Sequence, residues 1–273
     1  MQQELATKYE ALQRHLKELG KLVVSFSGGV DSTFLLAAAY EAIGKQVTAV
    51  TAAGKSVPRR EIEEAEEFCR ERGIRHIVFA FDELEIDEFA ENRPDRCYYC
   101  KTAILQKVRE IAEQVDAVYI AEGSNVDDDD DYRPGKRAVT EAGVISPLKE
   151  AGLTKEDIRQ ISREMGLATW NKPSFACLAS RFAYEEPITA EKLRMVEMAE
   201  EFLRKNGFSQ YRVRVHGSMA RVEVVTEDLE RFLEPNLRLE FTAYMKELGF
   251  TYTALDLDGY RSGSMNEVLK KEG

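Results

Sequence analysis

Short apolar runs alternate with helical patterns along the first half of the chain. Four runs have the length and apolar character of buried strands: residues 22–26, 46–51, 75–80 and 117–121. Three segments between them repeat apolar side chains at helical spacing: residues 32–43, 59–72 and 101–113. Strands that alternate with helices form parallel βαβ units. This half therefore predicts an α/β fold with a doubly wound parallel sheet, covered by helices on both faces.

The regular alternation of strand and helix patterns ends near residue 186. Residues 188–206 and 228–248 are typical of helices, and the strand candidates are residues 211–215, 220–225 and 252–257. A turn at residues 216–218 favours antiparallel pairing of the first two strands. We therefore expect a first domain over residues 1–185 and a smaller C-terminal α+β domain over residues 186–273.

Charge and composition narrow the classes of protein. The chain has 38 basic and 49 acidic residues, a net charge of −11, and this argues against broad nucleic-acid binding, which needs a basic surface. No apolar run is long enough to cross a membrane. Residues 1–20 follow a charged amphipathic helix pattern and not that of an export signal. We therefore expect a cytoplasmic protein whose four cysteines are thiols.

The strongest motif lies between the first predicted strand and helix, in the segment S-F-S-G-G-V-D-S at residues 25–32. Gly28 and Gly29 let backbone N–H groups approach an anion, and the following helix N-terminus favours negative charge. The segment lacks the lysine of a Walker A loop and is not G-x-G-x-x-G. It resembles the S-G-G-x-D-S signature of the PP-loop ATP pyrophosphatases. The resemblance implies that Ser27, Gly28, Gly29, Asp31 and Ser32 bind ATP, whose α-phosphorus is attacked while pyrophosphate leaves.

Three of the cysteines are candidates for sulfur chemistry. Cys97 and Cys100 form a C-x-x-C pair, and Cys177 lies in S-F-A-C-L-A-S-R. Cys69 falls on the apolar stripe of a predicted helix and is best explained as a core residue. Three thiolates suit a [4Fe–4S] cluster with one open iron that could hold a sulfide. A zinc site with a different fourth ligand, or a reactive Cys177 beside two ordinary thiols, are the alternatives.

Several motifs in one order make a family resemblance specific. With S-G-G-V-D-S they are C-Y-Y-C-K, E-G-S-N-V-D-D-D-D-D-Y-R-P-G, W-N-K-P-S-F-A-C-L-A-S-R-F and D-G-Y-R-S-G. Together they resemble the LarE family, ATP-dependent sulfur transferases that build the nickel-pincer cofactor of lactate racemase. The resemblance implies adenylation of a carboxylate of pyridinium-3,5-biscarboxylic acid mononucleotide and replacement of AMP by sulfur. Some members sacrifice the sulfur of one cysteine; the three cysteines here favour delivery from a cluster.

The resemblance also implies roles for individual residues. Lys101, Asp31 and Cys177 are expected to be catalytic, and Gly123, Ser124 and Asn125 to bind the nucleotide. The candidate Mg²⁺ ligands are Asp127, Asp128 and Asp131. The residues expected to bind the anionic substrate are Ser180, Arg181, Arg212, Arg214 and Arg261. Glu223 matches a metal-associated position of the family, but Arg231 stands where a second acid is expected.

Two other functions remain open at this point. A PP-loop tRNA thiolase shares the activation chemistry, although the net charge and the absence of a basic extension argue against RNA. A non-catalytic ATP or redox sensor would use the loop and the thiols for binding only. The resemblance further implies a homo-oligomer, and cluster chemistry implies a sulfide or another sulfur donor as a partner.

Overall fold

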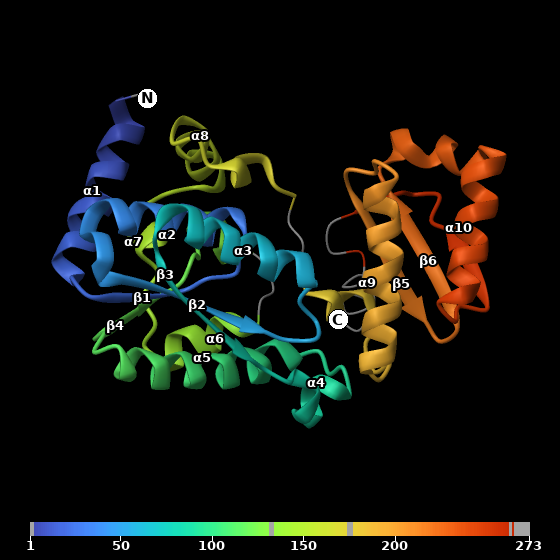
Figure 1. The fold of residues 1–273 in the computed structure, drawn as a ribbon, viewed down its shortest axis with the longest axis horizontal. Coiled ribbons are helices and arrows are strands. Elements are labelled where there is room, and N and C mark those ends of the chain that lie inside the picture. Colours follow the sequence, from blue (N-terminus) through green and yellow to red (C-terminus); the bar gives the residue numbers. More distant parts are fainter. Residues whose placement is uncertain (1–2, 131–133, 174–176, 262–263, 265–273) are drawn as a thin grey trace. The chain divides into compact units, whose positions relative to one another are not determined.

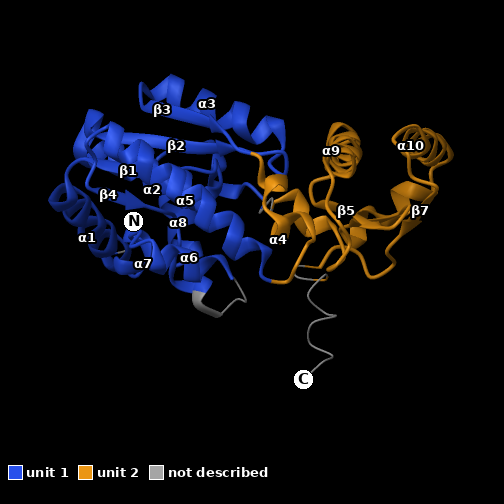
Figure 2. Cartoon of the chain, turned by 90° about the horizontal axis from the view of Figure 1, so that it is seen from below, with its two compact units in different colours: residues 1–81, 95–175 blue, residues 82–94, 176–273 orange. Residues whose placement is uncertain are grey.

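The computed structural model describes residues 3–130, 134–173, 177–261 and 264. The chain forms two compact units, and each of them is built from two segments (Figure 2). The first unit comprises residues 1–81 and 95–175, and the second comprises residues 82–94 and 176–273. The second unit therefore includes two segments, 82–94 and 176–185, that precede the predicted second domain. Within the described ranges, no helix has both the length and the apolar character needed to cross a bilayer.

The first unit is organised around a four-stranded sheet in the order β3-β2-β1-β4, and every pairing is parallel. The strands are β1 (Leu22–Ser25), β2 (Val47–Ala53), β3 (Arg75–Ala80) and β4 (Tyr119–Ala121). The sequence expectation of an α/β fold with a parallel sheet is confirmed. Because the strand order reverses between β1 and β4, their carboxyl ends flank the crevice where such sheets bind ligands.

Helices cover both faces of this sheet (Figure 1). Alternate residues of β1 enter different cores: Leu22 and Val24 pack with one apolar cluster, and Val23 packs with the other. The first cluster contains side chains of α1, α2, α3 and α8, and the second contains side chains of α5. The helices of this unit are α1 (Gln3–Leu19), α2 (Val30–Ile43), α3 (Arg59–Arg72), α5 (Arg96–Gln114), α6 (Gly135–Glu141), α7 (Pro147–Glu150) and α8 (Lys155–Glu164).

The central helix α2 is buried along most of its length, because its apolar side chains run almost without interruption from Phe34 to Ala39. A helix that is apolar all round belongs in a core, and here it fixes the end of the phosphate-loop segment. Short 3₁₀ helices complete the unit at η1 (Gly44–Gln46), η3 (Val126–Asp130) and η4 (Ala168–Asn171).

The second unit contains a three-stranded sheet in the order β5-β6-β7. Strands β5 (Tyr211–His216) and β6 (Met219–Val224) form the predicted antiparallel hairpin, whereas β7 (Tyr252–Leu255) joins β6 in parallel. A parallel neighbour requires a crossover, and α10 lies in that connection. The other helices are η2 (Glu83–Glu85), α4 (Asp87–Ala90), η5 (Leu178–Arg181), α9 (Ala190–Lys205), η6 (Thr226–Leu233) and α10 (Pro235–Glu247).

One predicted helix is divided in the structure. The pattern of residues 228–248 predicts a single helix, but η6 ends at Leu233 and α10 begins at Pro235. Glu234 is extended, with φ −65° and ψ 122°, as expected for a residue that precedes proline. Pro235 then occupies the first turn of α10, where its missing N–H costs no helical hydrogen bond. The prediction of one continuous helix was wrong, because the residue before Pro235 is extended and separates η6 from α10.

Candidate functional site

The loop between β1 and α2 has the conformation that its glycines and serines demand. Gly28 has φ +70°, a backbone conformation that residues with a side chain rarely adopt, so glycine suits the position. The Ser27 and Ser32 hydroxyl oxygens lie 3.0 Å apart. The Ser32 hydroxyl also accepts from the Ser27 N–H at 3.3 Å. These bonds close the loop onto the first turn of the helix.

The first turn of α2 directs its N–H groups toward this loop. The Thr33 N–H is bonded to the Gly29 carbonyl at 3.0 Å. The N–H groups of Val30, Asp31 and Ser32 precede this bond and have no carbonyl of the helix to reach. Together with the helix dipole, they form a site that favours an anion.

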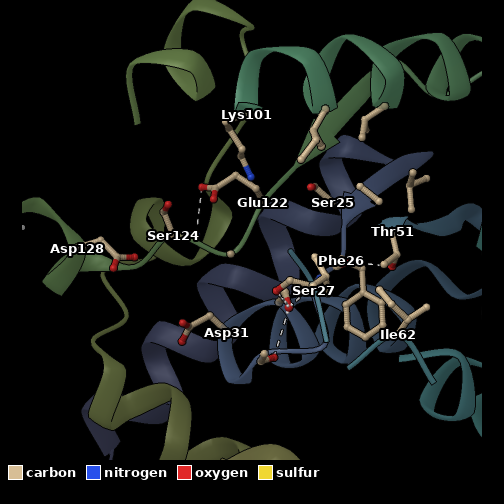
Figure 3. Close-up of a pocket in the computed structure, with 18 residues that line it drawn as sticks. Ser25, Phe26, Ser27, Asp31, Thr51, Ile62, Lys101, Glu122, Ser124 and Asp128 are labelled. Atoms are coloured by element: carbon tan, nitrogen blue, oxygen red, sulfur yellow. Dashed lines mark hydrogen bonds between the residues drawn. The ribbon is translucent and has the colours of Figure 1, made fainter. Parts of the chain in front are cut away.

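A pocket of about 300 Å³ opens above the loop. Its polar side is lined by Ser27, Gly29, Asp31, Ser32, Glu122, Gly123, Ser124 and Asp128. Figure 3 shows Lys101 reaching from α5 toward Glu122, on the far side of the pocket from Asp31. The pocket thus combines an anion-binding helix end, a lysine and carboxylates at the carboxyl ends of β1 and β4.

The opposite side of the pocket is apolar. Phe26, Ile62 and Val57 line it, beside Thr51 at the end of β2 (Figure 3). The Thr51 hydroxyl donates to the Phe26 carbonyl at 2.7 Å and lies 2.8 Å from His76 Nε2. Because the hydroxyl proton is used on Phe26, His76 Nε2 carries a proton and donates to Thr51. Burial lowers the pKa of His76, which favours this neutral, hydrogen-bonded ring.

Gly123 lies directly against the start of α2. A Cβ at this position would be 2.9 Å from the Ser32 nitrogen and 3.1 Å from the Asp31 carbonyl carbon. Only a residue without a side chain permits this approach, so the segment after β4 sets the position of the helix end that faces the pocket.

Asp31 is the carboxylate closest in sequence to the anion site, and Lys155 compensates its charge. Lys155 Nζ, at the first residue of α8, lies 2.5 Å from Asp31 Oδ2. Asp31 Oδ1 is buried and has no hydrogen-bond partner among the described residues. Burial raises the pKa of Asp31 and Asp128 adds to this, while Lys155 and Arg159 oppose it. Two carboxylates with one unsatisfied oxygen fit a Mg²⁺ ion beside bound phosphates.

The acidic segment after β4 divides its carboxylates between structure and pocket. Asp127 Oδ2 accepts from the Lys155 N–H at 2.7 Å and so caps the start of α8. Asn125 is buried, and its Oδ1 accepts from the Asp127 N–H at 2.9 Å. Asp128 lines the pocket, whereas Gly28, Asn125 and Asp127 do not. Asp131 lies outside the described residues.

Comparison with known proteins extends these observations to the whole chain. Residues 21–92 match the family model of the queuosine biosynthesis protein QueC. An uncharacterized protein of Synechocystis is 39% identical over 98% of this chain and 100% of its own length. The pyridinium-3,5-bisthiocarboxylic acid mononucleotide synthase of Lactiplantibacillus plantarum is 38% identical over 98% of this chain and 96% of its own length.

The chain belongs to the LarE family. Similarity over nearly the full length of both chains includes the second unit as well as the phosphate loop. A more distant uncharacterized protein of Methanocaldococcus jannaschii is 28% identical over 92% of this chain and 96% of its own length.

The cysteines of this LarE-family chain lie in both units. Cys97 and Cys100 are the second and fifth residues of α5, about one turn apart and thus on one face, with Cys97 exposed and Cys100 half-buried. The sequence predicted a helix that starts at Lys101, but α5 starts at Arg96 and therefore includes both cysteines. Cys177 is exposed at the start of η5 in the second unit. Cys69 is buried, and burial raises the pKa of its thiol to about 12.

Three of the four arginines expected to bind substrate, Arg181, Arg212 and Arg214, are buried in the second unit. Arg181 is fully buried and donates twice to Glu200, at 2.8 and 3.0 Å. Arg214 donates to both oxygens of Glu223, at 3.1 and 2.8 Å. The Arg212 guanidinium lies 5.0 Å from the centre of the Tyr260 ring.

Arg181 and Arg214 each form an ion pair with a buried glutamate, whereas the positive charge of Arg212 is disfavoured. Burial, and then the charge of Arg181, lower the pKa of Arg212 to about 10. Burial opposes ionisation of Glu200, yet the charge and hydrogen bonds of Arg181 hold the pKa of Glu200 below its ordinary value. Arg261 lies outside the buried group and pairs with Asp258 at 3.3 Å. An anion would relieve the repulsion between Arg181 and Arg212.

A metal ion does not fit the family position at Glu223. Its carboxylate already accepts from Arg214, from Arg221 at 3.2 Å and from the Ser264 hydroxyl at 3.0 Å. Arg231 is directed to Asp228 at 3.1 Å. Among the residues that the structure describes, no group of three or more His, Cys, Asp or Glu side chains could hold a metal ion.

Sequence reasoning missed two lysines that contact the phosphate loop. Lys155 pairs with Asp31, and Lys172 donates to the Gly28 carbonyl at 3.2 Å. Lys172 lies in the segment W-N-K-P-S, part of a motif shared with the family, and this was the sequence signal for a role of the lysine. For Lys155 the only signal was its position after Thr154, which caps α8.

Proposed function

We propose that this chain is a sulfur transferase that makes thiocarboxylates on pyridinium-3,5-biscarboxylic acid mononucleotide, using ATP to activate each carboxylate. The LarE-family membership and the activity for which the L. plantarum relative is named support the product class. The pocket above the phosphate loop supports the use of ATP, because an anion-binding helix end, Lys101 and the Asp31–Asp128 pair line one cavity.

The first step is an attack by a substrate carboxylate oxygen on the α-phosphorus of ATP. A bond forms from that oxygen to phosphorus, and the bond from the α-phosphorus to the bridging oxygen of pyrophosphate breaks. The N–H groups at the start of α2 and Gly29 hold the leaving pyrophosphate, and Lys101 stabilises negative charge as it develops. Asp31 and Asp128 would hold a Mg²⁺ ion, which would neutralise part of the negative charge of the phosphates.

The second step replaces AMP by sulfur. A sulfur nucleophile forms a bond to the acyl carbon, and the acyl carbon–oxygen bond to AMP breaks, which leaves a thiocarboxylate. Cys97 and Cys100 fit two thiolate ligands of a [4Fe–4S] cluster, and Cys177 would supply the third. Such a cluster, when bound, supplies a sulfide at its open iron.

The substrate also carries a phosphate, which needs a cationic site. The Arg212 guanidinium, whose positive charge is disfavoured by burial and by its neighbour Arg181, is the group we assign to it. Arg181 and Arg214 are each bonded to a buried glutamate. Arg181 and Arg214 therefore use most of their N–H donors on protein groups, and both also donate to Ser180.

Release of pyrophosphate tests the proposal. We expect the wild-type chain to release pyrophosphate and AMP with the pyridinium mononucleotide and not with tRNA, and mass spectrometry to detect the thiocarboxylate. Asp31→Asn should lose pyrophosphate release. Release that is stimulated by tRNA and not by the mononucleotide would show that the chain is a tRNA thiolase.

Iron and acid-labile sulfide, measured on anaerobically reconstituted protein, test the sulfur source. We expect near-equal iron and sulfide in the wild type and loss of both in Cys97→Ala. Cys69→Ala is the matched control, because Cys69 is a buried core thiol. Iron absent from all three proteins would move the sulfur source to Cys177 itself, consumed once per product; conversion of Cys177 to dehydroalanine would then be visible by mass.

A further inference from the structure

The side chain of Lys172 connects the phosphate loop to helix α3. Its ammonium nitrogen lies 3.2 Å from the Gly28 carbonyl oxygen and 2.7 Å from a carboxylate oxygen of each of Glu61 and Glu64. We propose that Lys172 is a positioning residue for adenylation: it holds the Gly28 carbonyl away from the nucleotide, so that the Gly29 N–H stays directed at the pyrophosphate group. This inference rests on the proposed use of ATP.

Lys172 is suited to position the loop and not to bind phosphate itself. An ammonium group has three N–H donors, and three acceptors lie within reach of this one. Two of the acceptors are carboxylates, so the local charge is not positive. The side chain is only 13% exposed, and Lys172 does not line the pocket.

The geometry of one peptide bond links Lys172 to the anion site. In a trans peptide the carbonyl of Gly28 and the N–H of Gly29 point in opposite directions. Gly29 lines the pocket and Gly28 does not, which matches a carbonyl turned outward to Lys172. A charged donor on that carbonyl also polarises the peptide, and this strengthens the Gly29 N–H as a donor.

Without the hydrogen bond from Lys172 to the Gly28 carbonyl, the loop can adopt a second conformation. Gly28 is at φ +70°, and glycine populates positive and negative φ with similar ease. Rotation of the peptide would turn a carbonyl oxygen toward the phosphates in place of an N–H group. Lys172 therefore selects the conformation that accepts an anion.

The backbone of Lys172 is itself fixed. Arg159, on α8, donates to the Trp170 carbonyl at 2.8 Å and to the Lys172 carbonyl at 3.1 Å. The Arg163 guanidinium lies 5.2 Å from the centre of the Trp170 ring. Because both ends of the Lys172 side chain are anchored, it can transmit the position of α8 and η4 to the loop.

The test must separate positioning from loss of fold, since Lys172→Met alone would take the 2.7 Å ion pair from the buried carboxylate of Glu61 and leave it the longer one to Arg60, at 3.5 Å. The double variant Lys172→Met/Glu61→Gln removes both charges, and Glu61→Gln alone keeps the bond from Lys172 to Gly28. Lys8→Met is a matched control, because Lys8 pairs with Asp157 at 2.8 Å away from the loop. Binding of inorganic pyrophosphate and of AMP to each full-length protein is measured by calorimetry with Mg²⁺ present.

We expect the double variant to bind pyrophosphate about tenfold more weakly than Glu61→Gln, which corresponds to one lost hydrogen bond to a charged group. Binding of AMP, which has no β or γ phosphate, should change less than about twofold. Equal pyrophosphate affinity in the two variants, or an equal loss for AMP and pyrophosphate, would overturn the positioning role. A wild-type chain that binds neither ATP nor pyrophosphate would instead overturn the proposed function, and this inference with it.

Discussion

Replacing Gly123 with alanine would put a methyl group into the gap between the end of β4 and the first turn of α2. The new carbon would lie 2.9 Å from the Ser32 nitrogen and 3.2 Å from Asp31 Cβ. Ordinary contacts begin near 3.4 Å, so the two segments must separate by about half an ångström. The atoms that must move are backbone atoms of α2, which cannot rotate away as a long side chain could.

The expected size of the effect follows from this displacement. Overpacking of this kind costs about 1–3 kcal/mol, and in a unit of this size that lowers the melting temperature by roughly 2–10 °C. The same shift moves the N–H groups of Asp31 and Ser32. A misplacement of about 1 Å in a catalytic constellation can cost about a hundredfold, so half of it should weaken nucleotide binding by about tenfold.

The assay is calorimetric titration with α,β-methylene-ATP, combined with thermal unfolding of the same samples. Gly135→Ala is the control, because a Cβ there would lie 3.5 Å from the Cys97 carbonyl oxygen, an ordinary contact. Gly135 begins α6, so alanine should be tolerated. Wild-type nucleotide affinity together with an unchanged melting temperature in Gly123→Ala would refute the argument that this close approach sets the anion site.

Three further predictions concern charges. Lys155→Met leaves the Asp31 carboxylate without its cation, so the Kd for ATP should rise by about tenfold in calorimetry at low Mg²⁺; an unchanged Kd would show that this pair has no part in nucleotide binding. Arg181→Met should destabilise the second unit by about 3–5 kcal/mol in urea unfolding because Glu200 is left buried and charged, and Arg181→Met/Glu200→Gln should recover most of the loss. The pKa of Glu200 is depressed in the folded chain, so its contribution to stability is present above its ordinary pKa of 4.5 and is lost as pH falls through the lower folded-state value. Stability should therefore fall less steeply below pH 4.5 in Glu200→Gln than in the wild type, and equal slopes would contradict the assignment.

The parallel sheet and its phosphate loop could be predicted because local signals agree there. A buried strand, a pair of glycines and an apolar helix follow one another within residues 22–43, and each restricts the same backbone. Strand β3 was predicted with its observed bounds, and β4 was predicted two residues too long at its start. The resemblance named further residues for the site, and of these Lys101, Gly123 and Asp128 line the pocket above the phosphate loop.

What could not be predicted depends on contacts between residues far apart in the chain. No local pattern indicates that Lys172 reaches Gly28, or that Lys155 reaches Asp31. The acidic run looks uniform in sequence, yet Asp127 caps α8 while Asp128 faces the pocket. The arginines of β5 were expected to face an anion, and the structure adds Glu223 as the buried partner of Arg214.

The two-segment construction of the second unit has a consequence for synthesis of the chain. The Asn92 side chain donates to the Ala183 carbonyl at 2.5 Å, and the Ile188 N–H donates to the Ala90 carbonyl at 2.8 Å. Ala183 follows Asn92 by 91 positions, which at ribosomal rates takes on the order of ten seconds to synthesise. During that interval most of the second unit has not been made, and Phe89, which is buried in the finished chain, has of its own unit only residues 82–94 to pack against. A nascent chain paused before residue 176 should therefore expose a short apolar segment to chaperones, and a fragment that starts at residue 186 would lack both residues 82–94 and residues 176–185 of its unit.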